Sequence, residues 1–117
     1  MLIKRIYRGN RGEGKTKWLV ENAIDVVTRC DKALTEVEDL NIYYIGSAHA
    51  YDNFCKMYRD IMHTKCPISR WDHDDMRGCD AAILFTDEIM NDIQLIPYHL
   101  PESGTWYITM SAEDFVQ

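Results

Sequence analysis

Residues 7–16 read YRGNRGEGKT, and Gly9, Gly14, Lys15 and Thr16 within them satisfy the pattern G-x-x-x-x-G-K-S/T completely. Glycines permit positive φ angles and carry no Cβ, so consecutive backbone N–H groups can converge on phosphate oxygens. A lysine at this position adds a point charge to the β- and γ-phosphates, and the threonine hydroxyl is a ligand for Mg²⁺. The pattern therefore predicts a loop that binds the phosphates of ATP through Gly9, Asn10, Arg11, Gly12, Glu13, Gly14, Lys15 and Thr16.

The sequence on either side of this loop predicts a strand before it and a helix after it. Residues 2–7 (LIKRIY) show some of the alternation of a short strand. After Thr16, apolar residues recur with the spacing of one helical stripe, at Leu19, Ala23, Val26, Val27 and Cys30. This order of strand, loop and helix is the one that a phosphate-binding loop requires, because the N-terminus of the helix then carries its partial positive charge toward the phosphates.

The middle of the chain predicts a second strand and a second helix. Residues 41–46 (NIYYIG) are rich in β-branched and aromatic residues, and Ser47 can cap a helix that follows them. The apolar face of that helix would consist of Tyr51, Phe54, Cys55, Tyr58, Ile61 and Met62. Residues 66–80 are polar and contain Pro67 and Gly78, so we expect a loop there.

Two further strands are predicted in the second half of the chain. Residues 81–86 (AAILFT) form a nearly continuous apolar run, which is typical of a strand buried on both faces. Residues 105–110 (TWYITM) predict a fourth strand. Residues 31–40 fit either a short helix or a connection, and the prolines within residues 95–104 allow at most a broken helix there.

Strands that alternate with helices indicate a parallel sheet with right-handed crossovers and with helices on both of its faces. We therefore expect one α/β domain, residues 1–117, with a three-layer phosphate-loop fold. Its small, mainly parallel sheet would have four strands in the spatial order first, fourth, third, second. Ligands of such sheets bind at the carboxyl ends of the strands, which is where the loop lies.

The third predicted strand is followed by two acidic residues, Asp87 and Glu88. Asp87 would lie at the carboxyl end of that strand, close to the Mg²⁺ ion that Thr16 also binds. Glu88, one residue further, is in position to polarise an attacking water as a general base. Such a pair alone is most often a solvated turn, but after a complete phosphate loop (Walker A) it predicts the second, Walker B, half of a hydrolytic site.

The glutamate beside the Walker B aspartate is typical of the phosphate-loop proteins that are named for an additional strand and a catalytic glutamate, which this chain resembles. In these ATPases a strand that ends in a polar sensor lies between the Walker A and Walker B strands. Residues 105–111 (TWYITMS) fit that strand. Ser111 is then the favoured sensor of the γ-phosphate, and Thr109 is the second choice.

A narrower resemblance comes from the loop itself. The run GNRGEGKT is similar to the Walker A variant of phage terminase large subunits, the motors of DNA packaging, which often reads G-x-R-G-x-G-K-S/T. Residues 76–88 (MRGCDAAILFTDE) are similar to the Arg-Gly lead-in that many terminases place before the Walker B strand. The resemblance implies that Arg11 acts as an arginine finger supplied in cis, and that the protein is phage-encoded and works in a DNA-processing or packaging-type assembly.

The composition limits the partners that we expect. A hydrophobic fraction of 46% with 27% charged residues is ordinary for a globular cytoplasmic protein, and no apolar run approaches the length of a membrane span. The formal net charge of −6 argues against a chain that grips nucleic acid unaided. We expect a homo-oligomer or a partner protein, because hydrolysis in such cores usually moves another component.

These observations predict an ATPase that requires ATP and Mg²⁺, with Lys15, Arg11, Glu88 and Ser111 as its catalytic residues. One alternative is a nucleotide-dependent switch with little hydrolysis, and a second is a small nucleotide or nucleoside kinase. A zinc site built from Cys55, His63, Cys66, His73 and Cys79 is less favoured than core or surface thiols, because the spacing is irregular.

Overall fold

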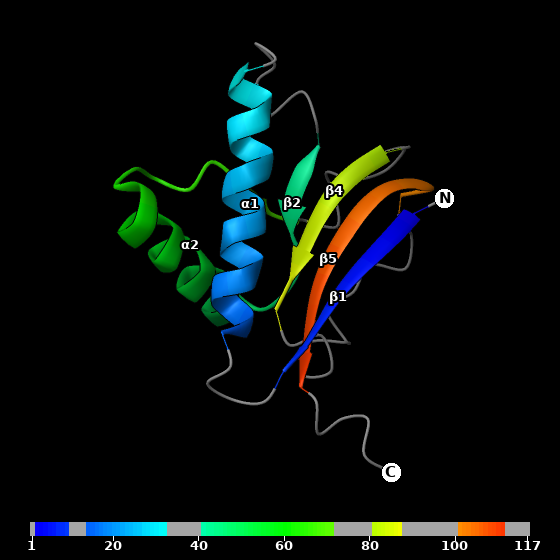
Figure 1. The fold of residues 1–117 in the computed structure, drawn as a ribbon, viewed down its shortest axis with the longest axis horizontal. Helices are drawn as coiled ribbons and strands as arrows, with labels where there is room; N and C mark the ends of the chain where they lie inside the picture. The colour runs from blue at the N-terminus through cyan, green and yellow to red at the C-terminus, as the bar shows by residue number, and fades with distance from the viewer. Residues whose placement is uncertain (1, 10–13, 33–40, 72–80, 88–100, 112–117) are drawn as a thin grey trace.

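The computed structural model describes residues 2–9, 14–32, 41–71, 81–87 and 101–111. These residues form seven elements in the order β1 (Leu2–Gly9), α1 (Lys15–Lys32), β2 (Ile42–Tyr44), α2 (Ala48–Met62), β3 (Ser69–Arg70), β4 (Ala81–Thr86) and β5 (Ser103–Ser111). Strands and helices alternate along much of the chain, so the fold belongs to the predicted α/β class (Figure 1). The predictions for residues 33–40 and 88–100 lie outside the described residues.

All strands belong to one sheet, whose order is β1-β5-β4-β2-β3 and whose neighbouring strands are all parallel. The predicted number of strands, four, is wrong, because β3 adds a fifth strand beside β2. The predicted strand order is incomplete for the same reason. The four expected strands keep their relative positions. β3 escaped the sequence prediction because its two residues are both polar and exposed, so they leave no apolar pattern in the loop that we expected over residues 66–80.

The strand that is described last, β5, lies between β1 and β4. Its register places Gly104 beside Leu2 and Ser111 beside Gly9, so β5 covers the whole length of β1. On its other side, Ser103 to Ile108 pair with β4. The predicted position of this strand, between the strand before the loop and the strand before Asp87, is therefore confirmed.

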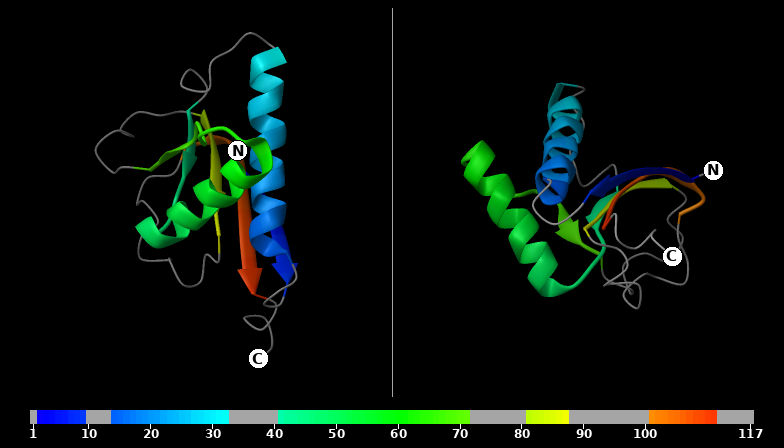
Figure 2. Two further views of the ribbon diagram at one scale, coloured as in Figure 1. Left: turned by 90° about the vertical axis from the view of Figure 1, so that its left-hand side faces the viewer. Right: turned by 60° about the horizontal axis from the view of Figure 1, so that its bottom comes forward.

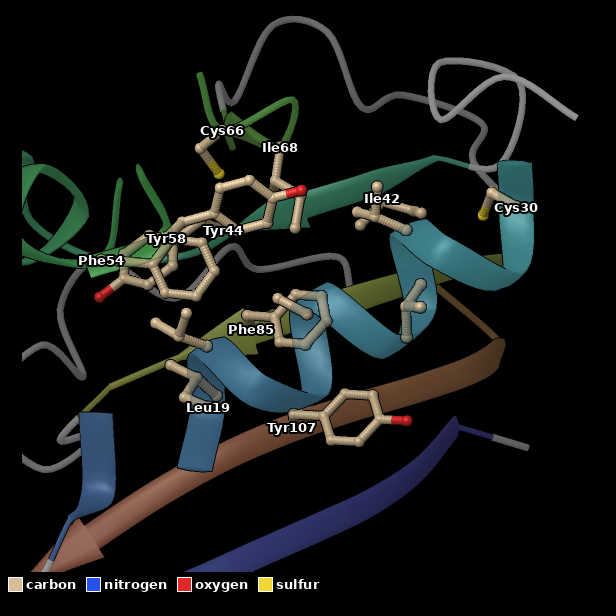
Figure 3. Close-up of a cluster of buried hydrophobic side chains, with 14 residues drawn as sticks. Leu19, Cys30, Ile42, Tyr44, Phe54, Tyr58, Cys66, Ile68, Phe85 and Tyr107 are labelled. Carbon is tan, nitrogen blue, oxygen red and sulfur yellow. The ribbon is translucent and has the colours of Figure 1, made fainter. Parts of the chain in front are cut away.

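Helix α1 forms because its apolar residues recur along one stripe, and all five of the predicted stripe residues are buried. They pack against β2, β4 and β5 and against α2, in a core cluster that is rich in aromatic rings (Figure 3). Phe85 stacks on Tyr107 with 5.0 Å between ring centroids, which joins neighbouring strands on this face of the sheet.

Helix α2 begins where predicted, since the Ser47 hydroxyl accepts a hydrogen bond from Ala50 N at 3.1 Å and caps the helix. Phe54 and Tyr58 are buried in the same core cluster as α1. The expected apolar face does not extend through the last turn, because Ile61 and Met62 are 43% and 38% exposed. The helix ends there, and His63 adopts a left-handed conformation as its C-cap.

Both described helices cover the same face of the sheet, as two views of the ribbon show (Figure 2). The opposite face has its own apolar cluster, which includes Ile45, Leu84, Trp106 and Ile108. We predicted three layers, and the described residues supply two of them. The alternation of Phe85 and Leu84 between the two clusters explains why residues 81–86 read as a continuous apolar run.

Candidate nucleotide-phosphate site

The residues of the predicted site come from elements that meet at one edge of the sheet. Because all strand pairs are parallel, the carboxyl ends of β1, β5 and β4 lie side by side. β1 ends at Gly9, α1 begins at Lys15, and Asp87 directly follows β4. The chain thus brings the start of the predicted phosphate loop, the start of the following helix and the predicted Walker B aspartate to the same edge (Figure 1).

At this edge of the sheet, both carboxylate oxygens of Asp87 accept hydrogen bonds from neighbouring elements. The Thr16 hydroxyl, on the first turn of α1, donates a hydrogen bond to Asp87 Oδ2 at 2.6 Å. The Thr109 hydroxyl, near the end of β5, donates to Asp87 Oδ1. One half-buried carboxylate is therefore held by hydroxyls from two different elements, and hydrogen bonds to an ionised group are stronger than those between neutral groups.

Thr109 was the second choice in the sequence analysis, after Ser111. The structure brings the Thr109 side chain to Asp87, and Thr109 is completely buried. Ser111 is the last residue of β5, and its side chain lies outside the described part. In the register of the two strands, Thr86 of β4 pairs with Ile108, so Thr109 directly follows that pair on β5, as Asp87 does at the end of β4. Its position could have been read from the sequence only with the register between β4 and β5.

Lys15 is the first residue of α1 and is only 8% exposed. Lysines are rarely buried to this degree, because removing the ammonium group from water is costly. Lys17, two residues further, shows the usual behaviour, since its side chain is 68% exposed and lies 3.9 Å from Glu21. Lys15 is therefore buried at the start of α1, whereas Lys17 belongs to the solvent-exposed face of that helix.

Gly14 has a φ of +77°, a value that favours glycine, and accepts a hydrogen bond from Trp18 N at 2.9 Å. A Cβ at this position would meet no atom within 4 Å, so no described atom lies where the side chain of a larger residue would begin. Gly14 directly precedes α1, whose first backbone N–H groups are of the kind that bind anions at a helix N-terminus.

Aromatic contacts hold the elements on both sides of the loop. Tyr7 of β1 stacks on Trp18 of α1 with 5.3 Å between ring centroids, and Trp18 lies 6.1 Å from the ring of Tyr107 on β5. Trp18 lies beside the apolar stripe of α1 and not within it. Through these two ring contacts it joins three elements beside the site. On the other face of the sheet, Trp106 Nε1 donates to Thr86 Oγ1 at 2.8 Å, between two buried side chains. This bond fixes the end of β4 directly before Asp87.

Of the predicted phosphate-loop residues, the structure describes Gly9, which is buried beside Ser111, and Gly14, Lys15 and Thr16. Asn10, Arg11, Gly12, Glu13 and the predicted base Glu88 lie outside the described residues. Their proposed roles therefore stay predictions.

The oxygen ligands at this edge fit a magnesium ion. Thr16 offers a hydroxyl and Asp87 a carboxylate, and Mg²⁺ in nucleotide sites is held by few protein oxygens together with phosphates and waters. Within the ranges that the structure describes, no group of three or more His, Cys, Asp and Glu side chains is arranged to hold a metal. Cys55, His63 and Cys66 thus form no such group with each other.

Comparisons with protein-family models, with curated proteins and with solved structures found no match to this chain. Of the helices in the described ranges, none has the length and apolar character to cross a membrane. The site is therefore interpreted from its own residues.

Proposed function

We propose that this protein binds ATP together with Mg²⁺ at the carboxyl edge of its sheet and hydrolyses it. The observation that carries the proposal is the hydrogen bond from Thr16 to Asp87, residues that are 71 positions apart. It joins the last residue of the Walker A pattern to the aspartate of the Walker B pattern. Each pattern alone is a weak signal, and their direct contact at the end of parallel strands supports a common site.

The residues of the site divide the binding task among them. Lys15 and the N-terminus of α1 supply positive charge for the phosphates, and Thr16 and Asp87 supply the oxygen ligands for Mg²⁺. When bound, the ion would neutralise charge on the phosphate oxygens. Thr109 holds the second oxygen of Asp87, so the carboxylate is oriented before any ligand arrives.

Hydrolysis adds Glu88 and Arg11 to these residues. Glu88 follows Asp87 directly and would accept a proton from the attacking water, and Arg11 would stabilise charge on the γ-phosphoryl group. These roles are supported by the sequence patterns and by the resemblance of the loop to terminase ATPases. Binding is supported by the described contacts as well.

Titration calorimetry with a slowly hydrolysed ATP analogue and Mg²⁺ tests the binding. Lys15→Ala should abolish detectable binding, because it removes the buried positive charge of the site. Lys17→Ala is the matched control on the same helix and should bind like the wild type, since this lysine faces solvent. Equal binding by the Lys15→Ala and wild-type proteins would exclude the site.

Phosphate release from ATP separates an ATPase from a switch. We expect Mg²⁺-dependent turnover in the wild type and a loss of about 100-fold or more in Glu88→Gln, which is the scale of general base catalysis. Binding without turnover in the wild type would instead favour a nucleotide-dependent switch. Turnover that survives in Glu88→Gln would show that another group activates the water.

The resemblance of the loop to terminase large subunits also supports a role in a DNA-processing assembly. Addition of double-stranded DNA should then raise the turnover, and light scattering should show a larger particle with ATP and Mg²⁺ than without them. A monomer whose turnover ignores DNA would contradict this role while leaving the ATPase site intact.

A further inference from the structure

β1 forms one end of the sheet, and among the described elements only β5 pairs with it (Figure 1). It is eight residues long, which makes this edge longer than the opposite edge strand, β3, with two. The edge of a strand presents a row of backbone donors and acceptors, and natural sheets usually shorten or cover such edges. The outer edge of β1, over residues 3–6, is therefore a candidate surface for an added strand.

The side chains on this part of β1 follow a regular pattern. Ile3 and Ile6 are 55% and 42% exposed, and Lys4 and Arg5 between them are exposed as well. Lys4 lies 5.7 Å from the ring of Trp106, on the face of the sheet opposite the helices. Because side chains alternate along a strand, Ile6 shares that face, and Ile3 and Arg5 share the face of α1. Each face of the edge thus presents one exposed isoleucine and one basic residue.

The charge of β1 differs from that of the whole chain. Its eight residues, LIKRIYRG, include basic side chains and no acidic one, while the chain has a formal net charge of −6. Antiparallel pairing of β1 with a second copy of itself would bring these basic residues opposite one another, and like charges directly opposite destabilise a strand pair. Charge complementarity therefore favours an acidic strand over a second copy of β1.

We propose that the outer edge of β1 binds an extended segment of a partner protein with the pattern apolar-acidic-acidic-apolar. Directly opposite residues of paired strands lie on the same face, so the two acidic residues would face Lys4 and Arg5, and the apolar residues would cover Ile3 and Ile6. The pattern reads the same in both directions, so it fits parallel and antiparallel addition alike. Backbone hydrogen bonds would supply affinity, and these four side chains would supply specificity.

Fluorescence anisotropy with labelled peptides tests the charge pattern. A peptide centred on Val-Glu-Glu-Val should bind the full-length protein, and one centred on Val-Lys-Lys-Val should not. The double variant Lys4→Glu, Arg5→Glu should bind the acidic peptide with an affinity that is lower by about tenfold or more. Two pairs of oppositely charged residues become pairs of like charge in this variant. The control variant, Lys56→Glu with Lys65→Glu, makes the same charge change at exposed positions away from β1 and should bind normally.

A peptide of reversed charge distinguishes a specific loss of binding from misfolding of the variant. The Lys4→Glu, Arg5→Glu protein should gain affinity for the Val-Lys-Lys-Val peptide, which a misfolded chain would not do. Circular dichroism compares its fold with that of the control variant. If the variant is folded but gains no affinity for the Val-Lys-Lys-Val peptide, the charge pattern does not determine recognition.

Methylation of the peptide backbone tests the strand addition itself. Only alternate residues of an added strand direct their N–H groups to the neighbouring strand. N-methylation of one alternate set of residues should therefore abolish binding, and methylation of the other set should leave it unchanged. Equal effects of the two sets would overturn the proposal. The proposal would also be overturned if a single-stranded oligonucleotide bound the protein and the acidic peptide did not. If that binding were lost in the Lys4→Glu, Arg5→Glu protein, the basic edge would recognise a nucleic acid.

Discussion

Replacement of Thr109 by valine would remove one hydroxyl from the network around Asp87 and leave the shape of the core almost unchanged. Thr109 is completely buried near the end of β5, and its hydroxyl donates to Asp87 Oδ1. Valine fills nearly the same volume, so no cavity forms. The cost should therefore come from the carboxylate oxygen that loses its donor.

The size of this cost follows from the charge of the acceptor. Hydrogen bonds to ionised groups contribute about 1.5–3 kcal/mol, because a half-buried carboxylate is poorly compensated by water. We expect Thr109→Val to lower the free energy of unfolding by that amount. At about 4 °C for each kcal/mol in a domain of this size, the melting temperature should fall by about 6–12 °C.

Urea denaturation, followed by circular dichroism, measures the change. Thr105→Val is the matched control, since Thr105 lies on the same face of β5 and is half-buried. It should change the free energy of unfolding by less than about 0.5 kcal/mol. A double-mutant cycle with Asp87→Ala isolates the contact, because Thr109→Val should cost little once the acceptor is gone.

Two results would refute this reasoning. The first is a Thr109→Val protein as stable as the Thr105→Val control. The second is an equal loss of stability in the Asp87→Ala background and in the wild type, which would mean that the hydroxyl acts without the carboxylate. In either case, the pre-oriented aspartate of the proposed Mg²⁺ site would lose its structural support.

Three other predictions concern the sheet and the core. Gly104→Ala should destabilise the protein by more than about 3 kcal/mol or prevent folding, because a Cβ there would lie 1.8 Å from the Ala82 carbonyl oxygen and φ is +119°; a normal urea midpoint would contradict this. Trp106→Phe should cost about 1–3 kcal/mol in the same assay, since the Thr86 hydroxyl loses a buried donor, and a neutral change would exclude that role. Burial raises the pKa of the Cys66 thiol from 9.0 to about 12. As pH rises above 9, the thiol therefore ionises in the unfolded chain before it ionises in the folded protein. The free energy of unfolding should then fall as pH rises from 9 toward 12. Cys66→Ala should flatten this slope, and an unchanged slope would contradict the cause.

The sequence predicted most reliably the elements that bury a periodic apolar face. The stripe of α1 has the helical period and packs against the sheet as expected. Residues 81–86 were predicted with the observed bounds, because a strand covered on both faces needs apolar residues at every position. β1 continues two residues beyond its predicted end, to Gly9, because the ladder with β5 extends to Ser111. That extension depends on a partner strand far along the chain, which no local pattern reveals.

The site illustrates the same limit. The motif spacing singled out Thr16 and Asp87, which the structure brings into contact, because each belongs to a pattern with a known chemical task. It ranked Ser111 above Thr109, because a residue at the end of a strand has no local signal for the side chain that it meets. Ile61 and Met62 continue the helical period of α2 but lie at its last turn, where they remain largely exposed. Registers and ends of elements are tertiary properties, so they emerge only from the assembled sheet.

The central position of β5 has a consequence for the way this chain folds. β1 is synthesised before the other described strands, but its only described partner in the sheet begins at Ser103. The pairing of Leu2 with Gly104 spans nearly the whole printed sequence, and such distant contacts close slowly because of their loop entropy. Gly9, where the predicted phosphate loop begins, can therefore reach its final position only after Ser111 has been synthesised. We expect β1 to join the sheet only after β5 has been synthesised, because β5 is the described strand that links β1 to the rest of the sheet.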